Sequence, residues 1–447
     1  MSGTSTRNLT LETAVAGVEA RYVAANPKSQ ARHQGALRSM PGGNTRTSLY
    51  YDPFPVTLVK GEGASLFDLD GHAYRDFLGE YTAGLYGHSD QAILEAIRSA
   101  LEDGLALGGP NRFEARLAEL FCARFPALEL VRFCNSGTEA NLMCLCLARA
   151  VTGREAIMAF TGGYHGAVLA FAGGGSPINA PFQTVIGEYN NAEGTRRLIA
   201  QHAKDLAAVI VEPMMGSAGC IPGEPEFLQA LREETALHGV VLVFDEVMTS
   251  RLAPGGMQER TGVMPDLAAF GKYLGGGISF GAFGGRAELM RRLDQRRADA
   301  LTHSGTYNNN VLSMAAGAAG LEKVFTAKAV ERLNATGDRL RVRLQAAADA
   351  RGVPMQVTGL GSMMCIHHQR RPIRRPSDWP PTSLAARKLL HLEMNLCGFY
   401  FARRGFIALS LPLTEADHDA FVAAFEEFLD DYAAVLADAA DAALGAG

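Results

Sequence analysis

The sequence predicts an α/β fold in which a large domain with a mainly parallel sheet is joined to a smaller α+β domain. The large-domain prediction depends on short apolar runs that alternate with helical patterns, because strands separated by helices form parallel βαβ units. The length of 447 residues supports more than one domain, since a single hydrophobic core seldom grows that large. Short strands mixed with helices near the C-terminus predict the second domain. We therefore divide the chain into residues 1–75, 76–334 and 335–447.

The first 75 residues are expected to pack with the small domain. They begin with a candidate helix, followed by an irregular segment rich in proline and glycine, MPGGNTRTSLYYDPFP. From Val56 apolar and polar residues alternate, and the pair Asp70-Gly71 predicts a turn. A small antiparallel hairpin is therefore predicted to end this segment.

The large domain is expected over residues 76–334. Residues 90–103, 112–124, 138–151 and 225–237 have the pattern of helices packed on one side. Short apolar runs between them are typical of strands that are buried on both faces. The predicted strands are 130–134, 156–160, 207–211, 240–244, 267–270 and 280–284.

The C-terminal domain is expected over residues 335–447. Residues 311–350 are predicted to form long helices that lead into it. Short strands are predicted at 355–358, 363–367 and 407–411, and an alanine-rich helix ends the chain. This mixture is typical of an α+β domain.

The composition is that of an ordinary globular protein and excludes several classes of partner. The net charge is −5, so nucleic acid is not an expected partner. No apolar run is long enough to span a bilayer, and the N-terminal residues MSGTSTRNLTLETA lack the apolar centre of a secretory signal. The seven scattered cysteines suit a reducing compartment. We expect a cytoplasmic protein without a metal site or disulfides.

Two charged residues that follow predicted strands carry the functional prediction. Asp245 follows the apolar run VVLVF, and Lys272 follows a second run just before three glycines. Ligands of an open α/β sheet bind outside the carboxyl ends of its strands, where both side chains are expected. A carboxylate there keeps a pyridine nitrogen protonated, and a desolvated lysine becomes a nucleophile. The pair predicts pyridoxal phosphate (PLP), bound covalently by Lys272 and through its ring nitrogen by Asp245.

Other residues that follow predicted strands fit the same cofactor. The segment FCNSGTEAN places small residues and hydroxyls at a helix start, where N–H groups and the helix dipole favour a phosphate. An ordinary capping box would give the same pattern in this segment. Taken singly, Asp245 could be a helix cap, Lys272 a solvated loop residue and Tyr164 a buried turn residue. The predicted contacts are Ser136, Gly137, Thr138 and Thr306 at the phosphate, Tyr164 and Val247 on the two ring faces, and Glu212 near the polar substituents of the ring.

The motifs DEVMTSR, GKYLGGG, NSGTEAN, GGYHG and HSGTYNNN together resemble those of the class III (fold type I) PLP-dependent aminotransferases. The resemblance covers nearly the whole chain. It implies the same cofactor roles, with Lys272 also moving protons during catalysis. Members of this family are homodimers with active sites at the subunit interface. The resemblance therefore implies that Thr306 reaches the phosphate bound by the neighbouring subunit.

Two subgroups of this family share further motifs with the sequence. GGG…GAFGGR is similar to the glutamate-1-semialdehyde aminomutases, whereas PGGNTRTSLYYDPFP, EYTAGLYGHS, DEVMTSRLAP and RRGFIALSLPLT resemble the aromatic β-amino acid aminotransferases. The second resemblance implies ping-pong transfer of the amino group of a β-phenylalanine-like substrate to 2-oxoglutarate or pyruvate. An aminomutase, a racemase of the same fold and a non-catalytic PLP-fold binding protein are the alternative functions.

Arginines are the expected ligands for the carboxylates of these substrates, because the planar guanidinium binds a carboxylate through two hydrogen bonds. The resemblance to the β-amino acid aminotransferases implies Arg46 for the carboxylate of the β-amino acid. It implies Arg404 for the distal carboxylate of 2-oxoglutarate, with the adjacent Arg403 as its alternative. A surface position is the other interpretation of each arginine.

Overall fold

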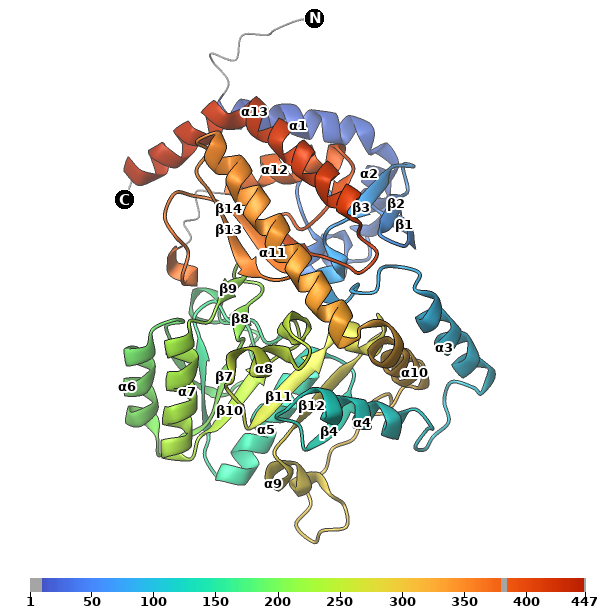
Figure 1. Cartoon of the computed structure of the whole chain (residues 1–447), viewed down its shortest axis with the longest axis vertical. Coiled ribbons are helices and arrows are strands. Elements are labelled where there is room, and N and C mark those ends of the chain that lie inside the picture. Colours follow the sequence, from blue (N-terminus) through green and yellow to red (C-terminus); the bar gives the residue numbers. More distant parts are fainter. Residues whose placement is uncertain (1–9, 379–383, 446–447) are drawn as a thin grey trace, which may run out of the picture.

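The described part of the chain has two lobes (Figure 1). The structure is a computed structural model in which residues 10–378 and 384–445 are described. The lower lobe contains the large sheet and its helices, and the upper lobe contains the first and last segments of the chain (Figure 1). Residues 1–9, where the N-terminal predictions begin, lie outside the described residues. No described helix is long and apolar enough to cross a membrane.

The sheet of the lower lobe has seven described strands in the order β4-β12-β11-β10-β7-β5-β6. Every pairing is parallel except the two made by β12, which confirms the predicted α/β class. Six strands follow the predicted apolar runs, but β6 was missed because this partly exposed edge strand has no such run. The strands are β4 (Leu130–Cys134), β5 (Ala156–Phe160), β6 (Gln183–Gly187), β7 (Leu206–Val211), β10 (Val241–Asp245), β11 (Leu267–Gly271) and β12 (Gly281–Gly285).

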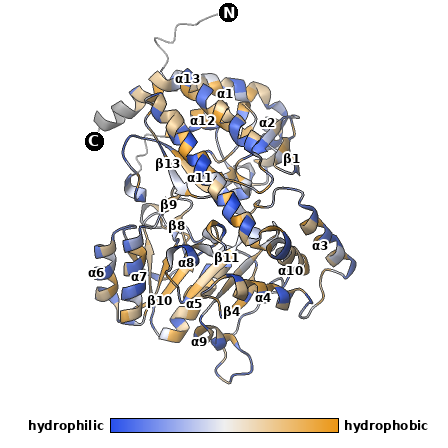
Figure 2. Ribbon diagram, viewed as in Figure 1, coloured by the Kyte–Doolittle hydropathy of each residue, from blue (hydrophilic) through white to orange (hydrophobic). Residues whose placement is uncertain are grey.

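Both faces of this sheet are buried under helices. Along β10, Val241 and Val243 pack in one hydrophobic cluster with α5 (Gly137–Thr152). Leu242 and Phe244 point to the other face and share a second cluster with residues of α4 (Glu114–Arg124) and α7 (Pro225–His238). Figure 2 shows the resulting hydrophobic colour along β10. Because the core takes up the side chains within the strands, polar groups that act on a ligand must lie at the strand ends.

The remaining helices of the lower lobe surround the sheet and confirm the helical predictions. The region predicted as long helices at 311–350 contains α10 and α11, separated by a π-helical turn, η9 (Gly320–Val324). A short pair, β8 (Met214–Met215) and β9 (Ile221–Pro222), follows β7. These helices are α3 (Gln91–Glu102), α4 (Glu114–Arg124), α6 (Ala192–His202), α7 (Pro225–His238), α8 (Gly256–Thr261), α9 (Ala287–Met290) and α10 (Val311–Ala319). The long helix α11 (Ala327–Ala350) lies in the upper lobe, where it packs against β13 (Met355–Leu360) and α13 (Glu415–Gly445) (Figure 1).

The upper lobe combines the two ends of the chain. The predicted N-terminal helix is present as α1 (Leu11–Ala25), but a second helix, α2 (Pro27–Ala36), was not predicted. It begins at Pro27, which cannot donate the hydrogen bond that would continue α1. The predicted hairpin is an antiparallel three-stranded unit. Its last strand, β3 (Ala73–Asp76), pairs in parallel with β15 (Phe399–Tyr400) from the C-terminal region. The helices that the two ends of the chain contribute to the upper lobe are α1 (Leu11–Ala25), α2 (Pro27–Ala36), α12 (Leu384–Leu396) and α13 (Glu415–Gly445).

The strands of the upper lobe form two small sheets. β13 and β14 are antiparallel, and β14 also pairs with β16, which is shorter than the predicted strand at 407–411. The strands are β1 (Leu58–Glu62), β2 (Ser65–Asp68), β3 (Ala73–Asp76), β13 (Met355–Leu360), β14 (Met363–His368), β15 (Phe399–Tyr400) and β16 (Phe406–Ala408).

Candidate active site

Asp245 and Lys272 lie at the carboxyl ends of two adjacent parallel strands. Asp245 is the last residue of β10 and pairs in register with Ala269 of β11. Lys272 follows β11 directly and has a φ of 57°, a left-handed conformation that residues other than glycine seldom adopt. Its Nζ donates a hydrogen bond of 2.7 Å to the carbonyl oxygen of Tyr81. The two predicted residues are thus neighbours at one edge of the sheet.

The Asp245 carboxylate is held by three hydrogen-bonding groups. Asn141 Nδ2 donates to Oδ2 at 2.8 Å, and His165 Nδ1 lies 2.9 Å from the same oxygen. The N–H of Val247 donates to Oδ1 at 3.0 Å. Asp245 is only 4% exposed, so this arrangement orients a carboxylate in a dry site. A cationic ring nitrogen beside this fixed carboxylate would be stabilised in its protonated form.

Asn141 and His165 received no role from the sequence, although both stand in the quoted motifs NSGTEAN and GGYHG. A signal for Asn141 was present. It lies four residues after Gly137 in α5, so it occupies the same helix face as the first turn that was predicted to bind phosphate. His165 comes from the loop after β5, and no sequence spacing links it to Asp245.

The N-terminus of α5 lies beside the lysine. Ser136 is the N-cap and its Oγ accepts the N–H of Glu139 at 3.1 Å, while Glu139 accepts the N–H of Asn135 at 2.8 Å. The N-cap half of the capping box that was the alternative interpretation is therefore present, but the Glu139 side chain accepts the N–H of Asn135 and not that of the N-cap residue. This cap leaves the first-turn N–H groups of Gly137 and Thr138, which have no partner within a helix, for a ligand.

Glycines bring these segments together. A Cβ on Gly271, the residue before Lys272, would lie 3.3 Å from the backbone nitrogen of Gly137. A Cβ on Gly137 would lie 2.7 Å from a methyl carbon of Val247. Only residues without side chains allow the lysine, the helix terminus and Val247 to approach this closely. An anion at the helix terminus would therefore lie next to the lysine-bearing strand.

The loop after β5 contributes Tyr164, and the end of β7 contributes Glu212. The Tyr164 side chain is half-exposed, and its N–H donates to Glu212 Oε1 at 3.0 Å. The second carboxylate oxygen accepts the N–H of Gly216 at 2.9 Å. Burial raises the pKa of Glu212 to about 7, against the attraction of His165. Glu212 thus fixes the loop that carries the tyrosine ring.

Burial also prepares Lys272 as a nucleophile. Removal from water lowers the pKa of the Lys272 ammonium to about 8, and the positive charge of Arg404 acts in the same direction. The carboxylates of Asp245, Glu212 and Glu80 oppose this effect. The neutral amine, which is the reactive form, is therefore accessible near neutral pH.

The two predicted arginines lie at the rim of the same site. Arg46 forms an ion pair of 2.7 Å with Glu80, and both side chains are about half-exposed. The Arg404 guanidinium lies 5.1 Å from the ring centre of Tyr81, the residue whose carbonyl accepts the lysine hydrogen bond. Arg403 is exposed. Glu80 and Tyr81 were not predicted, because their contacts join segments far apart in the sequence.

Thr306 is exposed in the single chain, on the loop between the short 3-10 helix η8 (Arg291–Leu293) and α10. This loop does reach the phosphate-type turn, since Asn135 Nδ2 donates to Asn308 Oδ1 at 3.0 Å. The chain alone does not bring Thr306 into the cluster described above.

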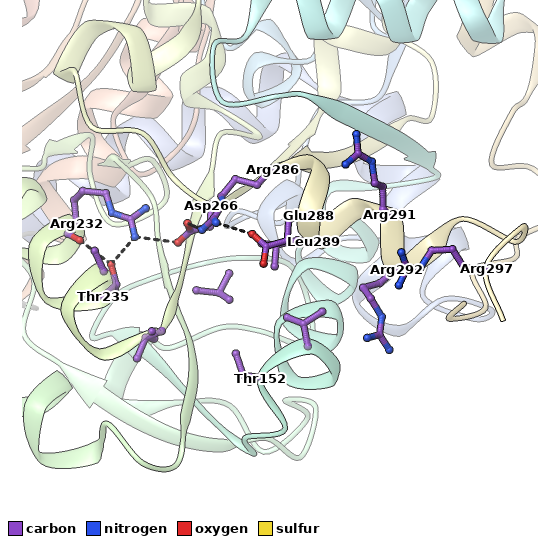
Figure 3. A pocket seen from close by; sticks show the side chains of 15 residues that line it. Thr152, Arg232, Thr235, Asp266, Arg286, Glu288, Leu289, Arg291, Arg292 and Arg297 are labelled. Atoms are coloured by element: carbon purple, nitrogen blue, oxygen red, sulfur yellow. Dashed lines mark hydrogen bonds and ion pairs between the residues drawn. The ribbon is translucent and has the colours of Figure 1, made fainter. Parts of the chain in front are cut away.

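A second concave region lies at the opposite, amino edge of the sheet. This pocket of about 670 Å³ is lined by residues that precede β10 and β11, including Asp266, and by several arginines. Figure 3 shows Arg232 and Arg286 directed at Asp266 from two sides. None of the predicted site residues lines it. The chemistry suggested by the sequence belongs to the carboxyl edge.

The residues at the carboxyl edge fit PLP by their own geometry. A buried lysine with a lowered pKa, a buried carboxylate without an arginine or lysine hydrogen-bonded to it among the described residues, and an open helix N-terminus occupy one site. These are the groups that the aldehyde, the pyridine nitrogen and the phosphate of this cofactor require.

Comparison with known proteins agrees with this geometry. Residues 47–388 match the family of class-III aminotransferases. The chain belongs to this family. Membership confirms the predicted enzyme class and cofactor, because class III aminotransferases use PLP.

Individual relatives extend this result. The chain is 50% identical to the β-phenylalanine transaminase of Variovorax paradoxus over 426 residues, which cover 95% of this chain and 98% of that protein. A crystal structure of a β-phenylalanine aminotransferase from the same organism superimposes with a TM-score of 0.94 at 49% identity, covering 95% of this chain and 99% of the other. The glutamate-1-semialdehyde 2,1-aminomutase of Rhodopirellula baltica is more distant, at 37% identity over 78% of this chain and 83% of that protein.

Proposed function

We propose that this aminotransferase moves the amino group of an aromatic β-amino acid to 2-oxoglutarate or pyruvate. The observation that carries the proposal is Arg46, which stands at the rim beside the segment that contacts Lys272. A β-amino acid has its carboxylate one carbon further from the reacting carbon than an α-amino acid has. An arginine on the rim, supplied by the N-terminal segment, suits that longer reach. The similarity to the β-phenylalanine transaminase supports the same substrate class.

The protein supplies attachment, orientation and proton transfer. When bound, PLP supplies an electron-withdrawing ring that stabilises negative charge at the amine-bearing carbon. Lys272 would hold the cofactor covalently, and its Nζ, when free, would serve as the general base that takes a proton from the amine-bearing carbon of the substrate. Asp245 would keep the ring nitrogen protonated, and Asn141 and His165 hold the Asp245 carboxylate in place for this role.

The remaining assignments concern the phosphate, the ring and the acceptor. Ser136, Gly137 and Thr138 are proposed to bind the phosphate at the start of α5, supported by the helix dipole there. Tyr164 and Val247 are proposed to lie on opposite faces of the ring, with Glu212 fixing the tyrosine loop. Arg404 is assigned to the distal carboxylate of 2-oxoglutarate in preference to the exposed Arg403.

The assembly proposed for the enzyme is a homodimer in the cytoplasm. The exposed position of Thr306, on a loop attached to the phosphate turn, is suited to contact with the cofactor of a second subunit. All seven cysteines are free, which fits a reducing compartment. We also retain 1–75, 76–334 and 335–447 as the proposed domain boundaries, with the first segment joined to the last through the pairing of β3 with β15.

The test is a half-reaction followed by the visible absorbance of the PLP-loaded enzyme. Adding 3-amino-3-phenylpropanoate without an acceptor is expected to bleach the cofactor band, because the amino group moves to the cofactor and stays there. Subsequent 2-oxoglutarate or pyruvate is expected to restore the band, and the more efficient one is the acceptor. Bleaching by glutamate-1-semialdehyde alone, with product formed in the absence of any keto acid, would instead support an aminomutase. A band that responds to no amine would favour the non-catalytic alternative.

A further inference from the structure

The segment Gly79–Thr82 (η4) forms a left-handed turn next to Lys272. The φ angles are 53° at Gly79, 45° at Glu80, 53° at Tyr81 and 82° at Thr82. Three of these four residues carry side chains, for which this conformation is unfavourable. Such a backbone persists only where the surrounding contacts hold it, and strained segments of this kind gather at functional sites.

The contacts of this turn reach the lysine and both rim arginines. The Tyr81 carbonyl oxygen accepts the Lys272 Nζ hydrogen bond at 2.7 Å. The Tyr81 hydroxyl donates to the carbonyl oxygen of Ser48 at 2.7 Å, which ties the turn to the segment that carries Arg46. The Tyr81 ring supports the Arg404 guanidinium at 5.1 Å. A change in this turn would therefore alter the positions of Lys272, Arg46 and Arg404, the three groups proposed to bind or react with the substrate.

Glu80 places a carboxylate on the arginine that is proposed to bind the carboxylate of the substrate. Its Oε1 lies 2.7 Å from Arg46 Nη2, and the two side chains are 49% and 44% exposed. Glu80 is also close enough to Lys272 for its charge to raise the pKa of the lysine, against the larger effect of burial. A substrate that enters between the lysine and Arg46 thus meets Glu80 as a competitor for the guanidinium.

We propose that Glu80 is a specificity-determining residue that moderates the preference of this enzyme for carboxylate-bearing amines. This inference rests on the proposed function, since it requires Arg46 to bind the carboxylate of the substrate. When the amine in the site has no carboxylate, the negative charge of Glu80 balances the positive charge of Arg46. When the substrate has a carboxylate, that carboxylate must replace Glu80 on Arg46. The net gain in binding free energy is therefore smaller than it would be for an unpaired arginine. Specificity is a difference between two such affinities.

The test compares two substrates that differ only in the carboxylate, 3-amino-3-phenylpropanoate and 1-phenylethylamine. In Glu80→Gln, the ratio of kcat/KM for the β-amino acid to kcat/KM for the amine is expected to rise about 1.5- to 5-fold, the range for loss of an exposed ion pair. The change is expected in the KM of the β-amino acid, with kcat nearly constant. Calorimetric binding of 3-phenylpropanoate, which cannot react, is expected to tighten by the same factor.

Two controls separate the proposed role from a general effect. Glu62→Gln removes another exposed ion pair, that between Lys60 and Glu62 at 2.6 Å, and is expected to leave the ratio unchanged. In an Arg46→Ala background, Glu80→Gln is expected to have no further effect on the ratio.

The outcomes are distinct. If Glu80→Gln leaves the ratio unchanged or lowers it while the wild-type enzyme prefers the β-amino acid, Glu80 only positions Arg46 and the inference is wrong. If the wild-type enzyme does not convert 3-amino-3-phenylpropanoate at all, the proposed function fails first, and the assignment of Glu80 falls with it.

Discussion

The two edges of the central sheet each hold a buried aspartate, but the surroundings of the two are opposite. At the carboxyl edge, the hydrogen-bond partners of Asp245 are an amide, an imidazole and a backbone N–H. At the amino edge, Asp266 accepts hydrogen bonds from the guanidinium groups of Arg232 and Arg286, each at 3.0 Å. The two acids are 4% and 5% exposed, so burial does not distinguish them.

The difference shows which buried charges stabilise the fold and which await a ligand. Asp266 is neutralised by cations of its own chain and also accepts the N–H of Leu242, so its role is complete without a ligand. No arginine in the described ranges is hydrogen-bonded to Asp245, and nearby Lys272 donates to a neutral carbonyl. A ligand with a cationic nitrogen completes the carboxyl edge. In the pocket at the amino edge, Asp266 is already paired with two arginines and has no need of a cationic ligand.

The largest expected effect concerns the lysine of the carboxyl edge. Lys272→Ala removes both the covalent attachment and the general base, so turnover should fall at least about 10⁴-fold. Arg291→Ala, in the amino-edge pocket, should retain full activity. Steady-state transamination by both purified variants, each loaded with PLP, measures the contrast. Activity retained by Lys272→Ala would overturn the assignment of the lysine.

The second prediction makes the same substitution, aspartate to asparagine, at each edge of the sheet. Asp245→Asn should lower kcat/KM about 10²- to 10³-fold, because a neutral amide cannot stabilise the protonated ring nitrogen. Asp266→Asn should instead lower the free energy of unfolding by about 1–3 kcal/mol, since it leaves two guanidinium groups poorly paired, and should retain kcat/KM. Kinetics and chemical denaturation of both variants test the comparison. An equal loss of activity in the two would show that the edges do not differ as argued.

The sequence predicted the carboxyl edge well for a physical reason. Strand ends, glycines and a helix start are local patterns, and parallel strands bring their carboxyl ends to one edge. Asp245, Lys272 and the turn at Ser136 could therefore be placed together from spacing alone. The strand β6 could not be found, because an edge strand needs no apolar run.

The contacts that the sequence could not predict are those between distant segments. Glu80 meets Arg46 only because the N-terminal segment folds onto the turn after β3. His165 meets Asp245 across 80 residues of chain, although both stand in quoted motifs. Local patterns specify which groups lie at a strand end, whereas the three-dimensional arrangement decides which charge meets which.

The pairing of the Arg46 charge is intermediate between those of the two aspartates. Of the variants Lys272→Ala, Asp245→Asn and Arg46→Ala, the last should have the smallest effect on activity. The charge of Arg46 is compensated by one acid, Glu80, in a half-exposed pair that a substrate can replace. Arg46→Ala should lower kcat/KM for 3-amino-3-phenylpropanoate about 10- to 100-fold, the range for losing a hydrogen-bonded ionic contact. It should change kcat/KM for 1-phenylethylamine less than about twofold, an amount within the effect of an exposed ion pair. Arg38→Ala, at an exposed arginine of the same segment, should affect neither substrate. Equal losses with both substrates would mean that Arg46 supports the fold of the rim, and the carboxylate would then need another ligand.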